Sequence, residues 1–231
     1  MKLSRRDFAL HGALAAIAAA SLPAHAQNSV MKAPPSPPRR GSFTPAQRED
    51  LARISAYLNG IGTLAADFTQ ISPQGGVSQG VFYLSRPGRL RFEYRPPSPT
   101  LIVATGGNIY VRNSRLNTVD RYSISDTPLE LLLTDNIDLA RNPAILGVDR
   151  IPGADGELEG LALRARSSTN RMQDNITILF AVRPTFEIRQ WTVRDAQGGN
   201  TQVSLSRIRR DVETPDSLFA VPVRAPSMRK G

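Results

Sequence analysis

The chain has 231 residues, a formal net charge of +9, no cysteine and only two histidines, His11 and His25. The absence of cysteine excludes disulfides, thiolate nucleophiles and thiolate metal sites, and it excludes a mature lipoprotein, whose acyl chains are attached to a cysteine. Both histidines lie in the first 26 residues, which have the features of a cleaved signal peptide. Without His or Cys, the mature chain lacks the usual nucleophile pairs and zinc ligands, so we expect no metal and no cofactor.

The amino-terminal segment 1–26 predicts export. Arg5 and Arg6 form a positive region, residues 9–22 are small and apolar, and Ala24-His25-Ala26 is a cleavage signal. The paired arginines followed by Phe8 resemble a twin-arginine export signal, and a general secretory signal is the alternative. No other stretch is apolar for long enough to span a bilayer. We therefore expect a soluble mature protein in the periplasm.

Next comes a proline-rich segment, residues 27–42, which we expect to be an extended linker rather than part of a core. A helix is predicted directly after it. Thr44 is a suitable N-cap, Pro45 occupies the first helical position, and Gln47 completes a capping box. The apolar residues of this helix recur at helical spacing, so one of its faces should be buried; they are Leu51, Ile54, Leu58 and Ile61.

Beyond residue 62 the apolar residues alternate with a period of two, which predicts strands. A second helical stretch begins at Thr127-Pro128 and is filled by Leu129 to Leu133, with a broken continuation as far as Asn142 left open. Turn residues separate the strands in meander order, which implies hairpin-linked antiparallel neighbours. The expected strands cover approximately 64–68, 77–84, 90–94, 101–104, 109–111, 118–122, 145–150, 158–165, 175–182, 186–193 and 201–209.

A sheet of this size must curl or be covered on its apolar face. We therefore predict an α+β fold, mainly antiparallel β. It would be an incomplete, half-open β-barrel of roughly ten to eleven strands, covered by the helices. The domain should span residues 43–222, and residues 223–231 should form a C-terminal tail.

The charged residues give little indication of a nucleic-acid site or of a catalytic site. Arginines alternate with apolar residues, as in Leu90-Arg91-Phe92, which is typical of the outer face of a half-buried sheet rather than of a nucleic-acid site. Glu157 and Glu159 have strand spacing and leave a carboxylate-based hydrolase open as a minor alternative. We expect neither nucleic-acid binding nor enzymatic activity.

The distinctive pattern is apolar. Several strand residues should point the same way, towards the two helices. The pattern alone does not distinguish a filled core from a cavity. The strand residues are Phe68, Phe82, Leu84, Leu90, Phe92 and Tyr94, and the helical ones are Leu51, Ile54, Leu58, Leu129, Leu131 and Leu132.

Five segments, in order, resemble the LolA family of lipoprotein carriers. Phe68-Thr69-Gln70 follows the first helix as in that family. The run from Gly80 to Tyr94, GVFYLSRPGRLRFEY, resembles the family's strand, basic-Pro turn and next strand. Leu101 to Gly107 matches its apolar strand and turn, Thr127-Pro128-Leu129 the start of its lid helix, and Asp216 to Phe219 the close of its domain.

The resemblance implies helices acting as a lid over a hydrophobic cavity, and no enzymatic activity. It implies that Arg86 latches the lid by hydrogen bonds, and that the apolar residues named above line the cavity or the lid. The implied cargo is acylated lipoproteins, taken by a monomer from an inner-membrane ABC transporter and passed to a LolB-like outer-membrane acceptor where one exists. The alternatives are a lipid- or lipopeptide-sensing regulator of the same fold, similar to RseB, and a structural domain with a packed core.

Overall fold

The computed structural model describes residues 43–127, 129–166, 175–195 and 197–222. The expected signal peptide (1–26), linker (27–42) and tail (223–231) lie outside the described residues. The described chain forms one antiparallel sheet of eleven strands in the order β6-β5-β4-β3-β2-β1-β11-β10-β9-β8-β7. In the described segments, no helix is both long and apolar enough to cross a membrane.

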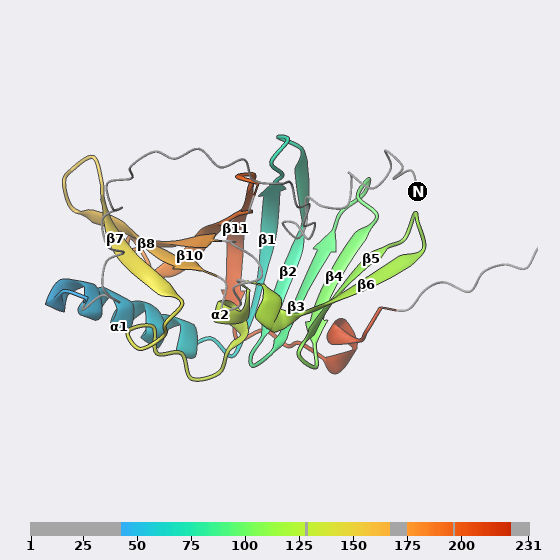
Figure 1. The fold of residues 1–231 in the computed structure, drawn as a ribbon, viewed down its shortest axis with the longest axis horizontal. Helices are drawn as coiled ribbons and strands as arrows, with labels where there is room; N and C mark the ends of the chain where they lie inside the picture. The colour runs from blue at the N-terminus through green and yellow to red at the C-terminus, as the bar shows by residue number, and fades with distance from the viewer. Residues whose placement is uncertain (1–42, 128, 167–174, 196, 223–231) are drawn as a thin grey trace, which may run out of the picture.

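The strands alternate with short turns, and the helical elements are few (Figure 1). Their bounds are α1 Pro45–Asn59, β1 Thr63–Ile71, β2 Val77–Ser85, β3 Arg89–Tyr94, β4 Thr100–Thr105, β5 Asn108–Asn113, β6 Thr118–Ser123, the 3-10 helix η2 Ile124–Asp126, α2 Glu130–Leu133, β7 Ile145–Pro152, β8 Leu158–Arg166, β9 Asn175–Ala181, β10 Glu187–Arg194, β11 Asn200–Arg210 and the 3-10 helix η3 Asp216–Phe219.

Helix α1 forms where the capping residues predict it. The Thr44 hydroxyl accepts from the Gln47 amide at 3.2 Å, and the Gln47 side chain accepts from the Thr44 amide at 3.0 Å. These bonds satisfy two amides that a helix N-terminus otherwise leaves unpaired. Gly60 caps the other end. The prediction of this helix is confirmed.

The pairing of β1 with β11 joins the two halves of the sheet, with Phe68 opposite Leu205 and Gln70 opposite Val203. Among the described strands, β6 and β7 are the two edges, so the sheet does not close. Figure 1 shows the sheet strongly curved, with α1 beside the β7–β10 half and α2 between the two halves. The predicted mainly antiparallel, incomplete barrel with few helices is confirmed.

The outer face of the sheet is covered locally by the C-terminal element η3. Arg91 on β3 donates from Nη1 to the Leu218 carbonyl at 3.2 Å. Arg89 donates to the Asp216 carboxylate at 2.6 Å and lies over the Phe219 ring at 5.1 Å from its centroid. Val103 is fully buried although it points to the side of the sheet opposite Ile102 and Ala104. This element therefore belongs to the folded domain.

The second helical stretch is shorter than its leucines suggest, because α2 ends at Leu133 and residues 134–144 are not helical. Thr134 is extended and Asn136 has a positive φ of 49°, which stops an α-helix. The continuation to Asn142, left open from the sequence, does not form. The reason is that side chains of α1 bind the backbone of this segment instead.

Candidate functional site

The inner face of the sheet is a continuous apolar surface in its β1–β3 half. Strand alternation points the predicted side chains to one side, with Phe82 opposite Phe92 and Leu84 opposite Leu90. Their exposures do not exceed 8%. The structure therefore brings the predicted strand residues together in one buried cluster: Phe68, Phe82, Leu84, Leu90, Phe92 and Tyr94.

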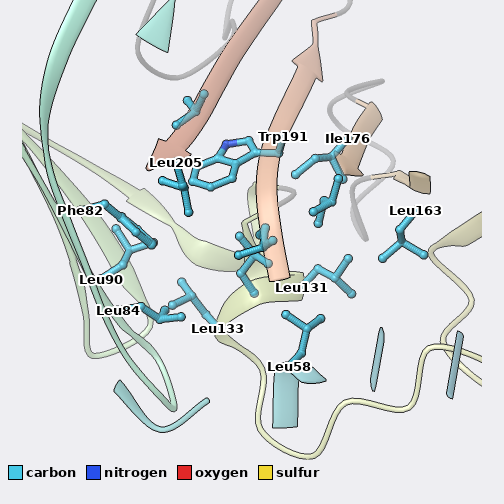
Figure 2. Close-up of a cluster of buried hydrophobic side chains, with 14 of the residues drawn as sticks. Leu58, Phe82, Leu84, Leu90, Leu131, Leu133, Leu163, Ile176, Trp191 and Leu205 are labelled. Atoms are coloured by element: carbon cyan, nitrogen blue, oxygen red, sulfur yellow. The ribbon is translucent and has the colours of Figure 1, made fainter. Parts of the chain in front are cut away.

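The predicted helical residues are buried in the same apolar cluster, those of α1 beside the β7–β10 half of the sheet and those of α2 between the two halves. Leu51, Ile54 and Leu58 of α1 are buried, as are the α2 residues 131–133. Leu129 is only partly buried but packs against the same cluster. Figure 2 shows Leu58, Leu131 and Leu133 gathered between Leu84 on one side and Leu163 on the other. All of the predicted apolar residues thus meet in space, while their part in binding stays a prediction.

The other half of the sheet contributes as much of the surface and was not singled out from the sequence. Trp191 on β10 is 2% exposed, and its ring centroid lies 5.8 Å from that of Phe82 and 6.1 Å from that of Phe92. The inward residues of these strands could have been predicted from the period-two alternation of apolar residues. The inward residues of this half are Leu161, Leu163, Ile176, Ile178, Phe180, Ile188, Trp191, Val203 and Leu205.

Arg86 connects both helices to the sheet. It lies just after β2 and donates from Nη1 to the Leu58 carbonyl and from Nη2 to the Thr134 carbonyl. The Leu58 carbonyl lies in the last turn of α1, where a cation is favoured, and it also accepts from the Ile61 amide at 3.1 Å. Thr134 is the extended residue directly after α2. The nearby Gly88 amide donates to the Leu133 carbonyl at 3.0 Å.

Partial burial changes the pKa of the Arg86 side chain. Desolvation lowers the pKa of Arg86 from its usual range, while the nearby Asp135 carboxylate opposes that shift. Its Nε is buried and has no hydrogen-bond partner in the described part of the chain. Arg86 thus contacts α1 and the residue after α2 from the β2–β3 turn, and its role as a latch stays a prediction.

A strap of residues 134–139 follows α2 and is bound along α1. Asn59 donates from Nδ2 to the Ile137 carbonyl at 2.9 Å and accepts from the Ile137 amide at 2.8 Å. The Ser55 hydroxyl accepts from the Leu139 amide at 3.1 Å. The strap is therefore held by directional bonds, whereas α2 itself presents mostly apolar side chains to the cluster.

The carboxylates of the hydrolase alternative lie elsewhere. Glu157 and Glu159 are exposed on and beside the β7–β8 hairpin, where Asp155 forms an ion pair with Arg183 at 2.9 Å. The Arg183 hydrogen bond lowers the pKa of Asp155, so this neighbourhood holds an ionised pair. In the described segments, no group of three His, Cys, Asp or Glu side chains could hold a metal ion.

Comparison with known proteins places the chain among carriers. Residues 59–222 match the family model described as outer membrane lipoprotein carrier protein LolA. An outer-membrane lipoprotein carrier protein from Chromobacterium violaceum is 28% identical, covering 78% of this chain and 86% of that protein. One from Dechloromonas aromatica is 31% identical, covering 72% and 80%. A LolA superfamily protein structure from Nitrosomonas europaea has a TM-score of 0.39 at 11% identity, covering 75% and 97%. The chain belongs to the LolA family.

Proposed function

We propose that this protein is a periplasmic carrier that shields the acyl chains of lipoproteins and moves them from the inner membrane to the outer membrane. The observation that carries the proposal is the continuous apolar inner face, closed by the short helix α2. Apolar contacts are non-directional, so acyl chains can replace the leucines of α2 against the same surface.

The energetics require such a device. Burial of each CH₂ group of an acyl chain is favourable by about 0.8 kcal/mol. Transfer of a chain of about 15 groups into water therefore costs roughly 12 kcal/mol. A carrier must offset most of this and still release its cargo. The closed lid lowers the net affinity for cargo, because cargo must displace α2 before it binds. The return of α2 then favours release of the cargo.

Arg86 is the proposed latch. One of its bonds goes to the Leu58 carbonyl of α1 and the other to Thr134, directly after α2, while the Gly88 amide binds Leu133 of α2 itself. Breaking the bonds to Leu133 and Thr134 frees α2, while the rest of the strap stays on α1 through Asn59 and Ser55. The proposed partners are an inner-membrane lipoprotein-release ABC transporter and, where present, a LolB-like outer-membrane acceptor. The carrier is proposed to act as a monomer and without enzymatic chemistry.

The test is release of lipoproteins from spheroplasts. Purified mature protein is incubated with spheroplasts, and the supernatant is assayed for soluble complexes of lipoprotein and carrier. Leu90→Glu places a charge on the inner face of β3, where Leu90 is 1% exposed, so the surface offered to the acyl chains carries an unpaired charge. Leu116→Glu is the matched control, because Leu116 is 56% exposed outside the cluster.

We expect soluble complexes with the wild type and with Leu116→Glu, and few with Leu90→Glu. Thermal unfolding confirms that the variants compared are folded. If the wild type releases no lipoprotein and native mass spectrometry finds no bound lipid after exposure to membranes, the carrier proposal is wrong and a packed structural domain takes its place. Lipid binding without release would favour a lipid sensor.

A further inference from the structure

The apolar inner face ends in a small polar group at the far end from α2. Along β1 the inward residues 64, 66 and 68 are apolar, and the next one is Gln70, which is 6% exposed. Tyr94 on β3 is 8% exposed and donates its hydroxyl to Gln70 Oε1 at 2.7 Å. The Phe68 ring packs edge-on against Tyr94, with centroids 5.0 Å apart. This polar pair is thus embedded in the apolar surface.

A third polar group on this face lacks a partner. Thr201 lies on β11, one inward position beyond Val203, and Val203 is opposite Gln70. Thr201 is 6% exposed, and its Oγ1 has no hydrogen-bond partner in the described part of the chain. The burial pattern of β11 turns Thr201, Val203 and Leu205 to the same side. A buried hydroxyl without a partner costs free energy, so an acceptor that reached the Thr201 hydroxyl would lower that cost.

The polar residues and α2 lie at opposite ends of β1, which would orient a bound lipid. Arg86 and α2 meet the sheet where β1 begins, since the Arg86 amide donates to the Gly62 carbonyl at 2.8 Å and Thr63 pairs with Ser85. Gln70 lies at the other end of β1, beside the β1–β2 hairpin. A lipid lying along the inner face would place one end at the polar group and the other beneath α2.

We propose that Thr201, Gln70 and Tyr94 form a hydrogen-bonding subsite for the ester and amide carbonyls that link acyl chains to the lipid headgroup. This inference rests on the proposed carrier function and sets the orientation of the cargo: its carbonyls lie at the β1–β2 hairpin end and its chains extend towards α2. Hydroxyls and an amide NH₂ are donors, and acyl carbonyls are acceptors without donors, so the chemistries match. A plain hydrocarbon chain leaves the Thr201 hydroxyl unpaired.

Burial raises the pKa of the Tyr94 hydroxyl well above its usual range, so it keeps its proton at neutral pH and remains a donor. If the Tyr94 hydroxyl donates to a lipid carbonyl instead of to Gln70, Tyr94 still donates one hydrogen bond. Thr201 is therefore the residue whose hydrogen bonding improves when a carbonyl arrives, and it is the residue to test.

The experiment compares two lipopeptides with the same peptide and chain length. One carries a diacylglyceryl group with ester linkages, and the other is the dialkyl ether analogue, which lacks both carbonyls. Affinity is measured by displacement of a fluorescent fatty acid from the mature protein. Thr201→Val removes the hydroxyl and keeps the shape. Thr192→Val is the control, because Thr192 follows Trp191 on β10 and therefore faces the other side of the sheet.

We expect the wild type to bind the ester lipopeptide about 2- to 10-fold more tightly than the ether, the range of one or two neutral hydrogen bonds. Thr201→Val should reduce that preference without weakening ether binding, and Tyr94→Phe should also reduce it. Thr192→Val should retain it. Equal affinity of the wild type for ester and ether, or an equal effect of Thr192→Val, overturns the subsite while the carrier function stands. Failure of the wild type to bind either lipid overturns both.

Discussion

Arg86 donates a hydrogen bond from Nη2 to the carbonyl oxygen of Thr134, the residue directly after α2, across 48 positions of the chain. Its other terminal nitrogen donates to the Leu58 carbonyl near the end of α1. One side chain of the β2–β3 turn thus contacts both helices that cover the apolar surface. A single substitution of Arg86 therefore removes both of these contacts.

Substitution Arg86→Leu should therefore change transfer more than uptake. Without the guanidinium the closed lid is less stable, so less free energy opposes cargo binding and less favours its release. We expect soluble lipoprotein complexes to form from spheroplasts as with the wild type, and their transfer to outer-membrane acceptor to fall. Arg141→Leu is the control, because that side chain is 90% exposed. Transfer at the wild-type rate by Arg86→Leu would show that Arg86 is not the latch.

Gly80 should tolerate no side chain. A Cβ at this position would lie 2.1 Å from the Glu93 carbonyl oxygen and 2.5 Å from Phe68 Cε1. We expect Gly80→Ala to lower the free energy of unfolding by about 1–3 kcal/mol, as overpacked cores do. Gly62→Ala is the matched control, since a Cβ there meets nothing within 4 Å. Urea denaturation measures both, and equal stabilities would contradict the packing of Phe68 over Gly80.

The ion pair between Asp50 and Arg150 should fix α1 to the edge strand β7. Asp50 is 5% exposed and accepts from Arg150 Nε at 2.8 Å and Nη2 at 3.0 Å. Asp50→Asn keeps the size but removes the charge, so a bidentate pair with one buried partner is lost and the melting temperature should fall. Asp149→Asn breaks the exposed pair with Arg164 and should change it less. A larger fall for Asp149→Asn would refute this ranking.

The strap should loosen when Asn59 is shortened. Asn59→Ala removes both bonds to Ile137, so the free energy of local opening there should fall by about 1–2 kcal/mol. Hydrogen exchange at the Ile137 amide measures this directly. Asn108→Ala removes a turn bond to Gly106 and should leave that amide unchanged. Unchanged exchange in Asn59→Ala would mean that the strap is held by its apolar residues alone.

Much of the fold could be predicted because its signals are local. Thr44, Pro45 and Gln47 act within one turn of helix, and the alternation of Leu90, Arg91 and Phe92 assigns each side chain to a face. The predicted apolar residues therefore meet in one cluster. The inward residues of β8 to β11 follow the same rule, and a systematic count of alternation would have included Trp191 and Leu163.

The segment after α2 could not be predicted in the same way. Leu129 to Leu133 favour a helix, but the amides of Ile137 and Leu139 bind to Asn59 and Ser55, about 80 positions earlier in the chain. No local pattern contains such partners. The strap's shape is thus a consequence of docking on α1.

The strands, their faces and the capped helix follow from the amino-acid sequence alone, because side-chain periods of 2 and 3.6 are properties of neighbouring residues. The order of motifs along the chain likewise indicates the family. Three further features depend on the folded chain: β1 pairs with β11, Arg86 reaches Thr134, and Thr201 lies one inward position beyond the partner of Gln70. These contacts join residues far apart in the chain, and their partners are selected by the curvature and register of the assembled sheet.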